Sequence, residues 1–399
     1  MTSAADLDRS DPLAAHRDLF VQSPDVVAYL DGNSLGRPLT ASITRVSEFM
    51  TDQWGSRLIR GWDEGWMEQG EKIGDDLGRV VLGAAAGQTS IGDSTTVLLY
   101  KLVRAAADAR PDRTELVIDR DNFPTDRYVL EGIAAERGLT VRWIDTSPTG
   151  GVTKADVAAV LSTNTAVVVL SHVAYRSGYL ADVRSITARI HEAGALALWD
   201  LCHSAGVVPT ELDAWGVDLA VGCTYKYLNG GPGSPAFAYV AERHQPHLRQ
   251  PIQGWLGSAT PFEMGQGYEP ADGIRRFLSG TPPVIGMLAM RDMIALIESV
   301  GLDAVRAKSV ALTEYAITLV DELLPSAVLA SPRNAAERGS HITIDRDGFD
   351  AIMPKLWEQG IIPDFRRPNG IRLGLSPLST SFGEVELGVR AIASLLEHP

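Results

Sequence analysis

Short apolar runs alternate with helical patterns over residues 90–245. The runs are rich in Val, Ile, Leu and Ala and lack polar alternation, which is typical of strands covered on both faces. They are ELVIDRD, LTVRWID, TAVVVLSHV and ALALWD, and the helical patterns between them are TDRYVLEGIAAERG, KADVAAVLS and DVRSITARIHEAG. This order predicts an α/β fold with a mostly parallel sheet.

A different pattern begins after GTPPVIG at 280–286. A long amphipathic stretch, the segments HITIDRD and IIPDFRR, and a last helix, SFGEVELGVRAIASLLEH, predict a smaller α+β unit. The residues before about 50 hold too few apolar runs to bury a core alone, so we expect them to pack with that unit. The expected organisation is an N-terminal segment (1–50), a large domain (51–285) and a small C-terminal domain (286–399).

The composition limits the classes of protein to which the chain can belong. The chain has 399 residues, of which 45% are hydrophobic, and no segment is apolar for long enough to span a bilayer. The N-terminal stretch has acidic residues and no apolar core, which argues against a secretory signal. A net charge of −14 disfavours nucleic acid or an anionic membrane as a partner. The only two cysteines, Cys202 and Cys223, fit a reducing cytoplasm.

Polar residues follow several of the predicted strands directly. Asp200 and His203 follow ALALW, Lys226 follows DLAVG, His172 ends VVVLS, and Asn122 to Asp126 follow ELVIDRD. In an open parallel sheet, ligands bind beyond the carboxyl ends of the strands. We therefore expect these side chains to line one pocket.

Lys226 stands in 218-DLAVGCTYKYLNGGPGSPAF-237, between two tyrosines and just before a glycine-rich turn. A loop lysine ordinarily extends to solvent. A tightly built backbone close to a ligand would instead desolvate the amine and favour its uncharged, nucleophilic form. Such a lysine suits a Schiff base with an aldehyde cofactor of the pyridoxal type.

A pyridoxal cofactor needs a carboxylate for its ring nitrogen, donors for its phosphate and a flat apolar side chain against its ring. Asp200 can supply the carboxylate, and Phe123 is a candidate for the ring contact. In 92-GDSTTVLLYKL-102, Thr95 and Thr96 stand where a loop enters a helix, so hydroxyls and free N–H groups can hold a phosphate. The same residues also fit a simple helix cap. No metal is expected.

Several segments of the chain resemble those of kynureninase, a fold-type I pyridoxal-phosphate family related to the class-V aminotransferases. The matches run in family order from residue 30 to about 285, with a weaker match at 371-IRLGLSPL-378. They are 30-LDGNSLG-36, 122-NFPTD-126, 199-WDLCHSAG-206, 222-GCTYKYLNGGPGSPAF-237, 254-GWLG-257 and 276-RFLSGTPPV-284.

The resemblance implies a role for each candidate residue. Lys226 would bind the cofactor, Asp200 would pair with its ring nitrogen, and Tyr225 would contact the phosphate and carry a proton. Other cofactor contacts would come from Thr95, Thr96, Phe123, Asp126, His203, Trp255 and Thr281, and substrate contacts from Asn33, Ser34, Trp62, Ser258 and Arg372. Phosphate contacts cross the dimer interface in related enzymes, so a homodimer with shared active sites is also implied.

The activity implied by the resemblance is hydrolysis of a C–C bond. The family cleaves the Cβ–Cγ bond of kynurenine or 3-hydroxykynurenine to an anthranilate and alanine, in tryptophan catabolism and NAD biosynthesis. This chain has Ser258 where many kynureninases have histidine, Leu98 in place of an asparagine and Ser379 in place of a tyrosine. We predict that the chemistry is kept and that a ring-modified kynurenine is preferred; neutral drift is the alternative.

Three alternative functions stay open. An aminotransferase would use the same lysine and aspartate but would bind a keto acid in a second half-reaction. A cysteine desulfurase needs a cysteine on a mobile loop, whereas Cys202 and Cys223 lie within or beside strand-end segments. The third reading is a regulatory protein that binds the cofactor without catalysis, against which the presence of Lys226, Asp200 and Arg372 argues.

Overall fold

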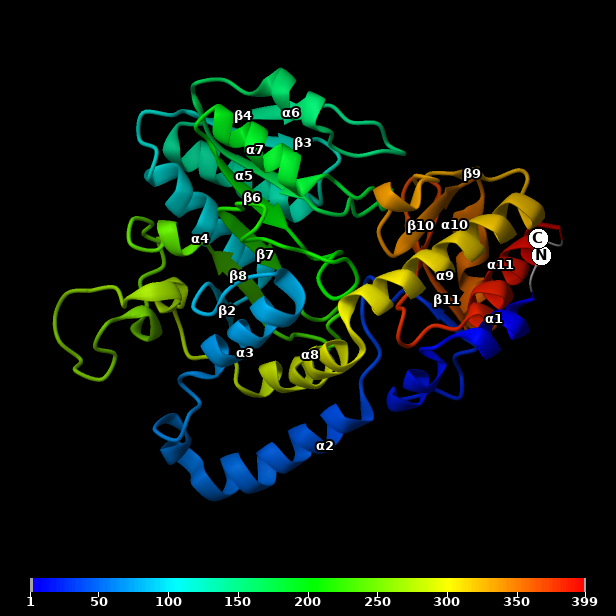
Figure 1. Cartoon of the computed structure of the whole chain (residues 1–399), viewed down its shortest axis with the longest axis horizontal. Helices are drawn as coiled ribbons and strands as arrows, with labels where there is room; N and C mark the ends of the chain where they lie inside the picture. Colours follow the sequence, from blue (N-terminus) through cyan, green and yellow to red (C-terminus); the bar gives the residue numbers. More distant parts are fainter. Residues whose placement is uncertain (1–2, 398–399) are drawn as a thin grey trace.

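A seven-stranded sheet forms the centre of the large domain in the computed structural model, which describes residues 3–397 (Figure 1). The strand order is β2-β8-β7-β6-β5-β3-β4. All neighbours run parallel except β8, which is antiparallel to both β2 and β7. The bounds are β2 Thr89–Gly92, β3 Glu115–Asp119, β4 Thr140–Ile144, β5 Thr165–Ser171, β6 Leu196–Asp200, β7 Leu219–Gly222 and β8 Ala236–Val240. The predicted mostly parallel α/β sheet is confirmed.

Alternate side chains of each central strand enter two separate apolar cores. In β6, Leu196 and Leu198 pack on the side of α4 and α5, whereas Ala197 and Trp199 pack on the side of α3, α7 and α8. Burial on both faces explains why the strands read as continuous apolar runs. The helices of these layers are α3 Gln69–Leu77, α4 Thr95–Asp108, α5 Pro124–Arg137, α6 Lys154–Val160, α7 Val183–Glu192 and α8 Leu288–Val300.

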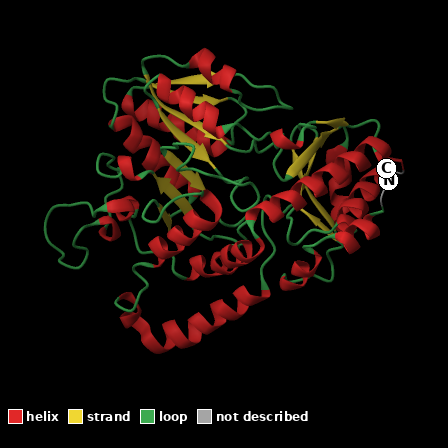
Figure 2. Ribbon diagram, in the orientation of Figure 1, coloured by secondary structure: helices red, strands yellow, loops and turns green. Residues whose placement is uncertain are grey.

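A five-stranded sheet of order β1-β11-β12-β10-β9 forms the smaller domain. The N-terminal strand β1 (Ala28–Leu30) pairs in parallel with β11 (Ile361–Arg366), so the beginning of the chain completes this sheet. Figure 2 shows the two sheets as separate groups of strands with helices around each. The other elements are α1 Ala4–Ser10, α9 Leu302–Leu323, β9 Val328–Leu329, β10 His341–Asp345, α10 Phe349–Glu358, β12 Gly370–Gly374 and α11 Phe382–Glu397.

Helix α2 (Thr40–Glu48) connects the N-terminal segment to the large domain and forms the lower edge of the molecule in Figure 1. It continues into the short helices η2 (Phe49–Gly55) and η3 (Leu58–Trp62), and Arg45 pairs with Asp292 of α8. The other short helices are η1 Ala14–Leu19, η4 Gly78–Leu82, η5 Glu242–His244, η6 Trp255–Gly257, η7 Gly273–Phe277, η8 Ile285–Met287 and η9 Ala335–Glu337. Among residues 3–397, no helix has the length and apolarity that a membrane crossing requires.

The core of the large domain extends past the expected boundary at residue 285. Met290, Met293 and Ile294 of α8 pack in it, as does Val305 near the start of α9, while α9 from Leu312 onward packs in the core of the small domain. The domain limits at residues 50 and 285 stay predictions.

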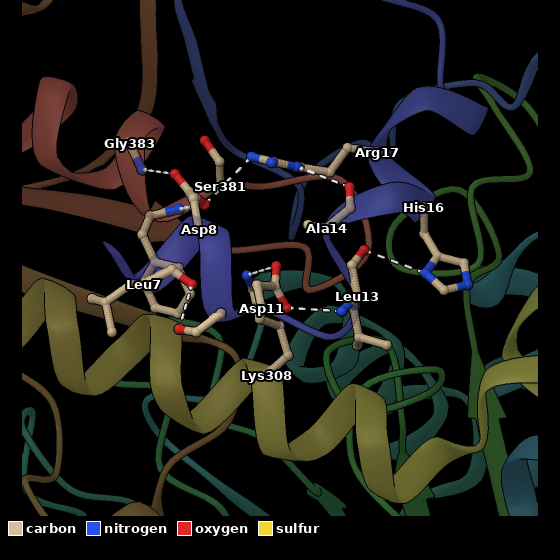
Figure 3. A network of polar contacts seen from close by, with 12 residues as sticks. Leu7, Asp8, Asp11, Leu13, Ala14, His16, Arg17, Lys308, Ser381 and Gly383 are labelled. Atoms are coloured by element: carbon tan, nitrogen blue, oxygen red, sulfur yellow. Dashed lines mark hydrogen bonds and ion pairs between the residues drawn. The ribbon is translucent and has the colours of Figure 1, made fainter. Parts of the chain in front are cut away.

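Buried polar contacts join the N-terminal segment to the small domain (Figure 3). Asp11 pairs with Lys308 of α9, and their side chains are 2% and 4% exposed. Asp8 accepts hydrogen bonds from the backbone N–H groups of Phe382 and Gly383, each at 3.0 Å. These N–H groups begin α11 and have no partner within the helix, so Asp8 caps it from a distant part of the chain.

We expect Asp11→Ala to lower the free energy of unfolding by about 3 kcal/mol, because removing one partner of a buried ion pair leaves the other charge unpaired. Arg9→Ala is the matched control, since the Arg9–Asp6 pair is exposed to solvent. Urea unfolding of both variants measures the difference. Equal effects of the two substitutions would mean that the Asp11–Lys308 contact does not stabilise the fold.

Candidate active site

The polar residues predicted at the strand ends meet at the carboxyl edge of the large sheet. Asp200 ends β6, Lys226 lies in the loop after β7, and Phe123 and Asp126 begin α5 after β3. His172 is different: it is buried against the rings of Trp199 and Trp215, at 6.5 and 5.9 Å between centroids. Burial lowers its pKa to about 3. It is therefore a neutral core residue, and the expectation that it lines the pocket is wrong.

The Lys226 amine lies among flat side chains. Its Nζ is 3.2 Å from Nε2 of His203 and 5.9 Å from the ring centroids of both Phe123 and Tyr225. Burial, and then the positive charge of Lys226, hold the pKa of His203 well below its usual range. His203 is therefore neutral, and its Nε2 can accept a proton or a hydrogen bond from the amine.

The loop that carries Lys226 is fixed by the N-terminal segment. The N–H of Gly36 donates to the carbonyl of Tyr225 at 2.8 Å, and a Cβ at Gly36 would lie 2.3 Å from the carbonyl oxygen of Lys226. Asn229 donates to the carbonyl of Arg37 at 2.6 Å. Only glycine permits this approach at residue 36. The GNSLG segment thus supports the lysine loop directly.

Two carboxyl groups share the space beside Lys226. Asp200 accepts the backbone N–H of Cys202 at 2.7 Å, and Asp126 contacts Asp200. Burial, and then the charge of Asp200, raise the pKa of Asp126 well above its usual range. Asp126 is therefore a neutral acid beside Asp200. Among the residues that the structure describes, Oδ2 of Asp126 is buried without a partner, which indicates that a further polar group belongs at this corner.

A cavity of about 460 Å³ opens beside the start of α4. Ser94 caps the helix by accepting the N–H of Val97 at 3.4 Å; Thr95 is half-buried and Thr96 is exposed. The free N–H groups of the first turn suit an anion. The residues that line the cavity include Asp93, Ser94, Tyr225, Leu256 and Thr281. Thus Tyr225 and Thr281, distant in sequence, face the same space.

Three tryptophans form an aromatic cluster near this cavity. The ring of Trp62 lies 5.3 Å from that of Trp66 and 6.4 Å from that of Trp255, in both cases edge to face. Ser258 follows η6 and, with Trp255, lines a second cavity of about 740 Å³. The Ser258 hydroxyl accepts the N–H of Thr260 at 3.3 Å.

Arg372 of β12 is buried among polar partners. Its guanidinium donates to the Tyr175 carbonyl at 2.6 Å and the Ser34 hydroxyl at 2.9 Å, and pairs with Asp364 at 2.7 Å. When the Asn33 amide is oriented to satisfy its neighbours, its oxygen accepts Nε of Arg372 at 3.0 Å and its nitrogen donates to Asp31 at 3.1 Å. The structure therefore brings together Asn33, Ser34 and Arg372. Burial raises the pKa of Asp31 to about 6.

Sequence reasoning missed the acidic partners of this arginine. Asp364 lies in IIPDFRR, where a charged residue inside an apolar strand was the available signal, and Asp31 precedes the GNSLG turn.

Besides Ser258, the structure places the other two residues at which the chain departs from the family pattern. Leu98 is 2% exposed within the core of the large domain, so it packs against apolar neighbours, and Ser379 is buried near Tyr227.

The fold and these residues define a class-V aminotransferase-like protein. The family "Aminotransferase class-V" matches residues 92–362. A cysteine desulfurase from Thermococcus onnurineus NA1 superimposes with a TM-score of 0.81 at 18% identity, covering 100% of this chain and 99% of that one. The C-S lyase C-DES, solved with cysteine persulfide, gives 0.81 at 18% identity, covering 92% and 97%. These likenesses concern the fold alone.

The relatives in sequence are more specific. The kynureninase of Pseudomonas fluorescens is 39% identical over 98% of this chain and 94% of its own length. The kynureninase of Burkholderia pseudomallei (strain 1106a) is 40% identical with the same coverage. The chain belongs to the kynureninase family, and the resemblance in its motifs is confirmed.

Proposed function

We propose that the chain is a pyridoxal-phosphate-dependent hydrolase that cleaves the Cβ–Cγ bond of L-kynurenine or a ring-modified kynurenine to an anthranilate and L-alanine. The observation that carries the proposal is the buried Lys226 amine, beside neutral His203 and the Asp200–Asp126 pair, in a chain of this family. Identification of the two products tests it.

Because both cysteines are free thiols, we place the enzyme in the cytoplasm.

The residues present fit pyridoxal phosphate. When bound, the cofactor supplies an aldehyde for the Lys226 amine and a protonated ring that accepts an electron pair from the substrate Cα. Asp200 would hold the ring nitrogen, the unpartnered oxygen of Asp126 is a second polar group beside that contact, and Phe123 would lie against the ring. The start of α4 and the nearby cavity suit the phosphate. Its contacts would come from Thr95, Thr96, Tyr225, Trp255 and Thr281.

The chain's own residues then bind substrate and move protons. Arg372 receives the α-carboxylate, with Asn33 and Ser34 orienting the guanidinium. Lys226 takes the Cα proton, and neutral His203 holds the amine in place. Burial raises the pKa of Tyr225, so its hydroxyl stays protonated and can donate while water adds to the γ-ketone. The tryptophan cluster provides flat walls for an aryl group.

We also propose a homodimer with shared active sites. Large apolar side chains lie exposed along α2, η2 and η3, with Ile59 75% and Ile43 56% exposed. Such a face is typical of an interaction surface. This segment ends at Trp62, which packs on Trp255 beside the active site, so a second copy that covers it would also reach the site.

We expect Ile59→Glu to shift the protein from dimer to monomer, because it places a charge at the most exposed large apolar side chain of this face. Light scattering in dilute solution measures the mass. Val328→Glu is the control, since Val328 is 63% exposed but lies at the edge of the small-domain sheet. An unchanged protein that is monomeric and fully active would contradict the proposal.

We propose that Ser258 adapts the enzyme to a ring-modified kynurenine. A hydroxyl in place of an imidazole changes the hydrogen bonds available at the aryl end. We expect the unchanged enzyme to prefer a ring-substituted analogue, and Ser258→His to raise kcat/KM on L-kynurenine roughly tenfold. Leu98→Asn is the contrasting variant: it buries an amide in the core and should lower stability without changing preference. A strong preference for L-kynurenine that Ser258→His leaves unchanged would exclude this role.

A further inference from the structure

His341 is a buried histidine that no step of the proposed mechanism uses. It begins β10 and its side chain is 0% exposed. Neither ring nitrogen forms a hydrogen bond of good geometry among residues 3–397, although the backbone of Ala174 lies close enough to raise the pKa of the ring. Buried polar groups nearly always have partners, so an imidazole without a well-formed hydrogen bond indicates that a further group completes the site.

The strand register places His341 beside the substrate arginine. In the antiparallel pair of β10 and β12, Thr343 lies opposite Arg372 and His341 lies opposite Gly374. Opposed side chains share a face of a sheet, and so do side chains two residues apart. His341, Thr343 and Arg372 therefore project from the same face of the small-domain sheet.

That face is turned toward the lysine site. Arg372 donates to the carbonyl of Tyr175, and Thr343 donates to the carbonyl of Arg176, both in the large domain. The His341 ring lies 5.6 Å from the ring of His203, whose Nε2 is 3.2 Å from the Lys226 amine. His341 thus stands between the arginine and the lysine.

The neighbouring charges keep His341 neutral. Burial, and then the cations of Arg372, Lys226 and Arg366, hold its pKa well below the usual range. A neutral imidazole has one N–H and one lone pair. The polar groups around it are already engaged: Arg372 is bonded to Ser34, Tyr175 and Asp364, and His203 faces Lys226.

We propose that His341 is a substrate-binding residue whose N–H donates a hydrogen bond to the α-carboxylate that Arg372 neutralises. Asp364 already occupies one nitrogen of this guanidinium at 2.7 Å, and Asp31 lies 4.0 Å from it, so the two negative charges weaken its hold on a further carboxylate. His341 supplies a free donor from the same sheet face. This inference rests on the proposed function, because it takes the ligand to be an amino acid.

The test is calorimetric titration of L-alanine, the α-carboxylate product, into the pyridoxal-phosphate-loaded enzyme. His341→Phe keeps a flat ring and removes both nitrogens, and His341→Leu is a second variant without a donor should the first fail to fold. We expect the Kd for L-alanine to rise about tenfold in these variants, as for loss of one charge-assisted hydrogen bond. His341→Gln retains an N–H donor and should recover most of the affinity.

L-alanine methyl ester separates this role from a structural one. Because the ester lacks the negative charge, its Kd should change less than about twofold between the unchanged enzyme and His341→Phe. Equal losses for acid and ester, unchanged binding of L-alanine by both donor-less variants, or no L-alanine binding by the unchanged enzyme would each overturn the inference. Kynurenine turnover by the unchanged enzyme is followed in parallel, so a failure of the proposed function is seen separately.

Discussion

Lys226→Ala is expected to abolish turnover, with kcat falling at least about 10³-fold, because the variant loses both the nucleophilic amine and the base for the Cα proton. Its surroundings are specific to this lysine: the amine is buried, lies 3.2 Å from a neutral imidazole and is 5.9 Å from the centroids of two aromatic rings. Borohydride reduction of the loaded enzyme, followed by peptide mass analysis, should place the cofactor on Lys226 alone.

Lys154→Ala provides the control for this experiment. Lys154 is an exposed lysine at the start of α6, and its replacement should leave both activity and the reduced adduct unchanged. A borohydride-stable adduct that persists in Lys226→Ala, or one found on another peptide of the unchanged enzyme, would show that the cofactor is attached elsewhere.

The second large effect is expected from Asp200. Asp200→Asn should lower kcat/KM on the order of 10³-fold, because an amide cannot hold the proton on the cofactor's ring nitrogen. Asp126→Asn should lower it by less than about tenfold. Asp126 is already a neutral acid beside Asp200, and an amide is likewise uncharged and keeps a hydrogen-bond donor.

The Asp200 and Asp126 variants together test the assignment of charge within the carboxyl pair. Steady-state kinetics and the visible absorbance of the bound cofactor are measured for both. Equal losses, or a larger loss in Asp126→Asn, would place the ionised carboxylate at Asp126 and reverse the roles given to the two residues.

The sheet and its edge were predictable because they depend on local pattern. Strands such as β5 and β6 are covered on both faces, so their apolar runs are continuous. A parallel strand then places the residue that ends it at the ligand-binding edge. Asp200 and Lys226 follow from that rule, although His172 satisfies the same rule and is a core residue.

The surroundings of Arg372 could not be predicted in the same way. The resemblance grouped Asn33 and Ser34 with Arg372, but its partner Tyr175 comes from a distant segment that only tertiary packing brings to it. The sequence did not indicate that His341 lies near the site, because a histidine at the start of a strand is also common at the protein surface. At Leu98 the sequence suggested a role that the structure does not support. Its departure from the family pattern indicated a change at the substrate, but its position on α4 places the side chain in the core.

Product analysis after incubation of the reconstituted enzyme with L-kynurenine and ring-substituted analogues tests the central claim most directly. Chromatography with mass detection should find the corresponding anthranilate and L-alanine in equal amounts, with formation dependent on pyridoxal phosphate. A keto acid formed by transamination in place of these products, or no consumption of any kynurenine by the loaded enzyme, would contradict the account.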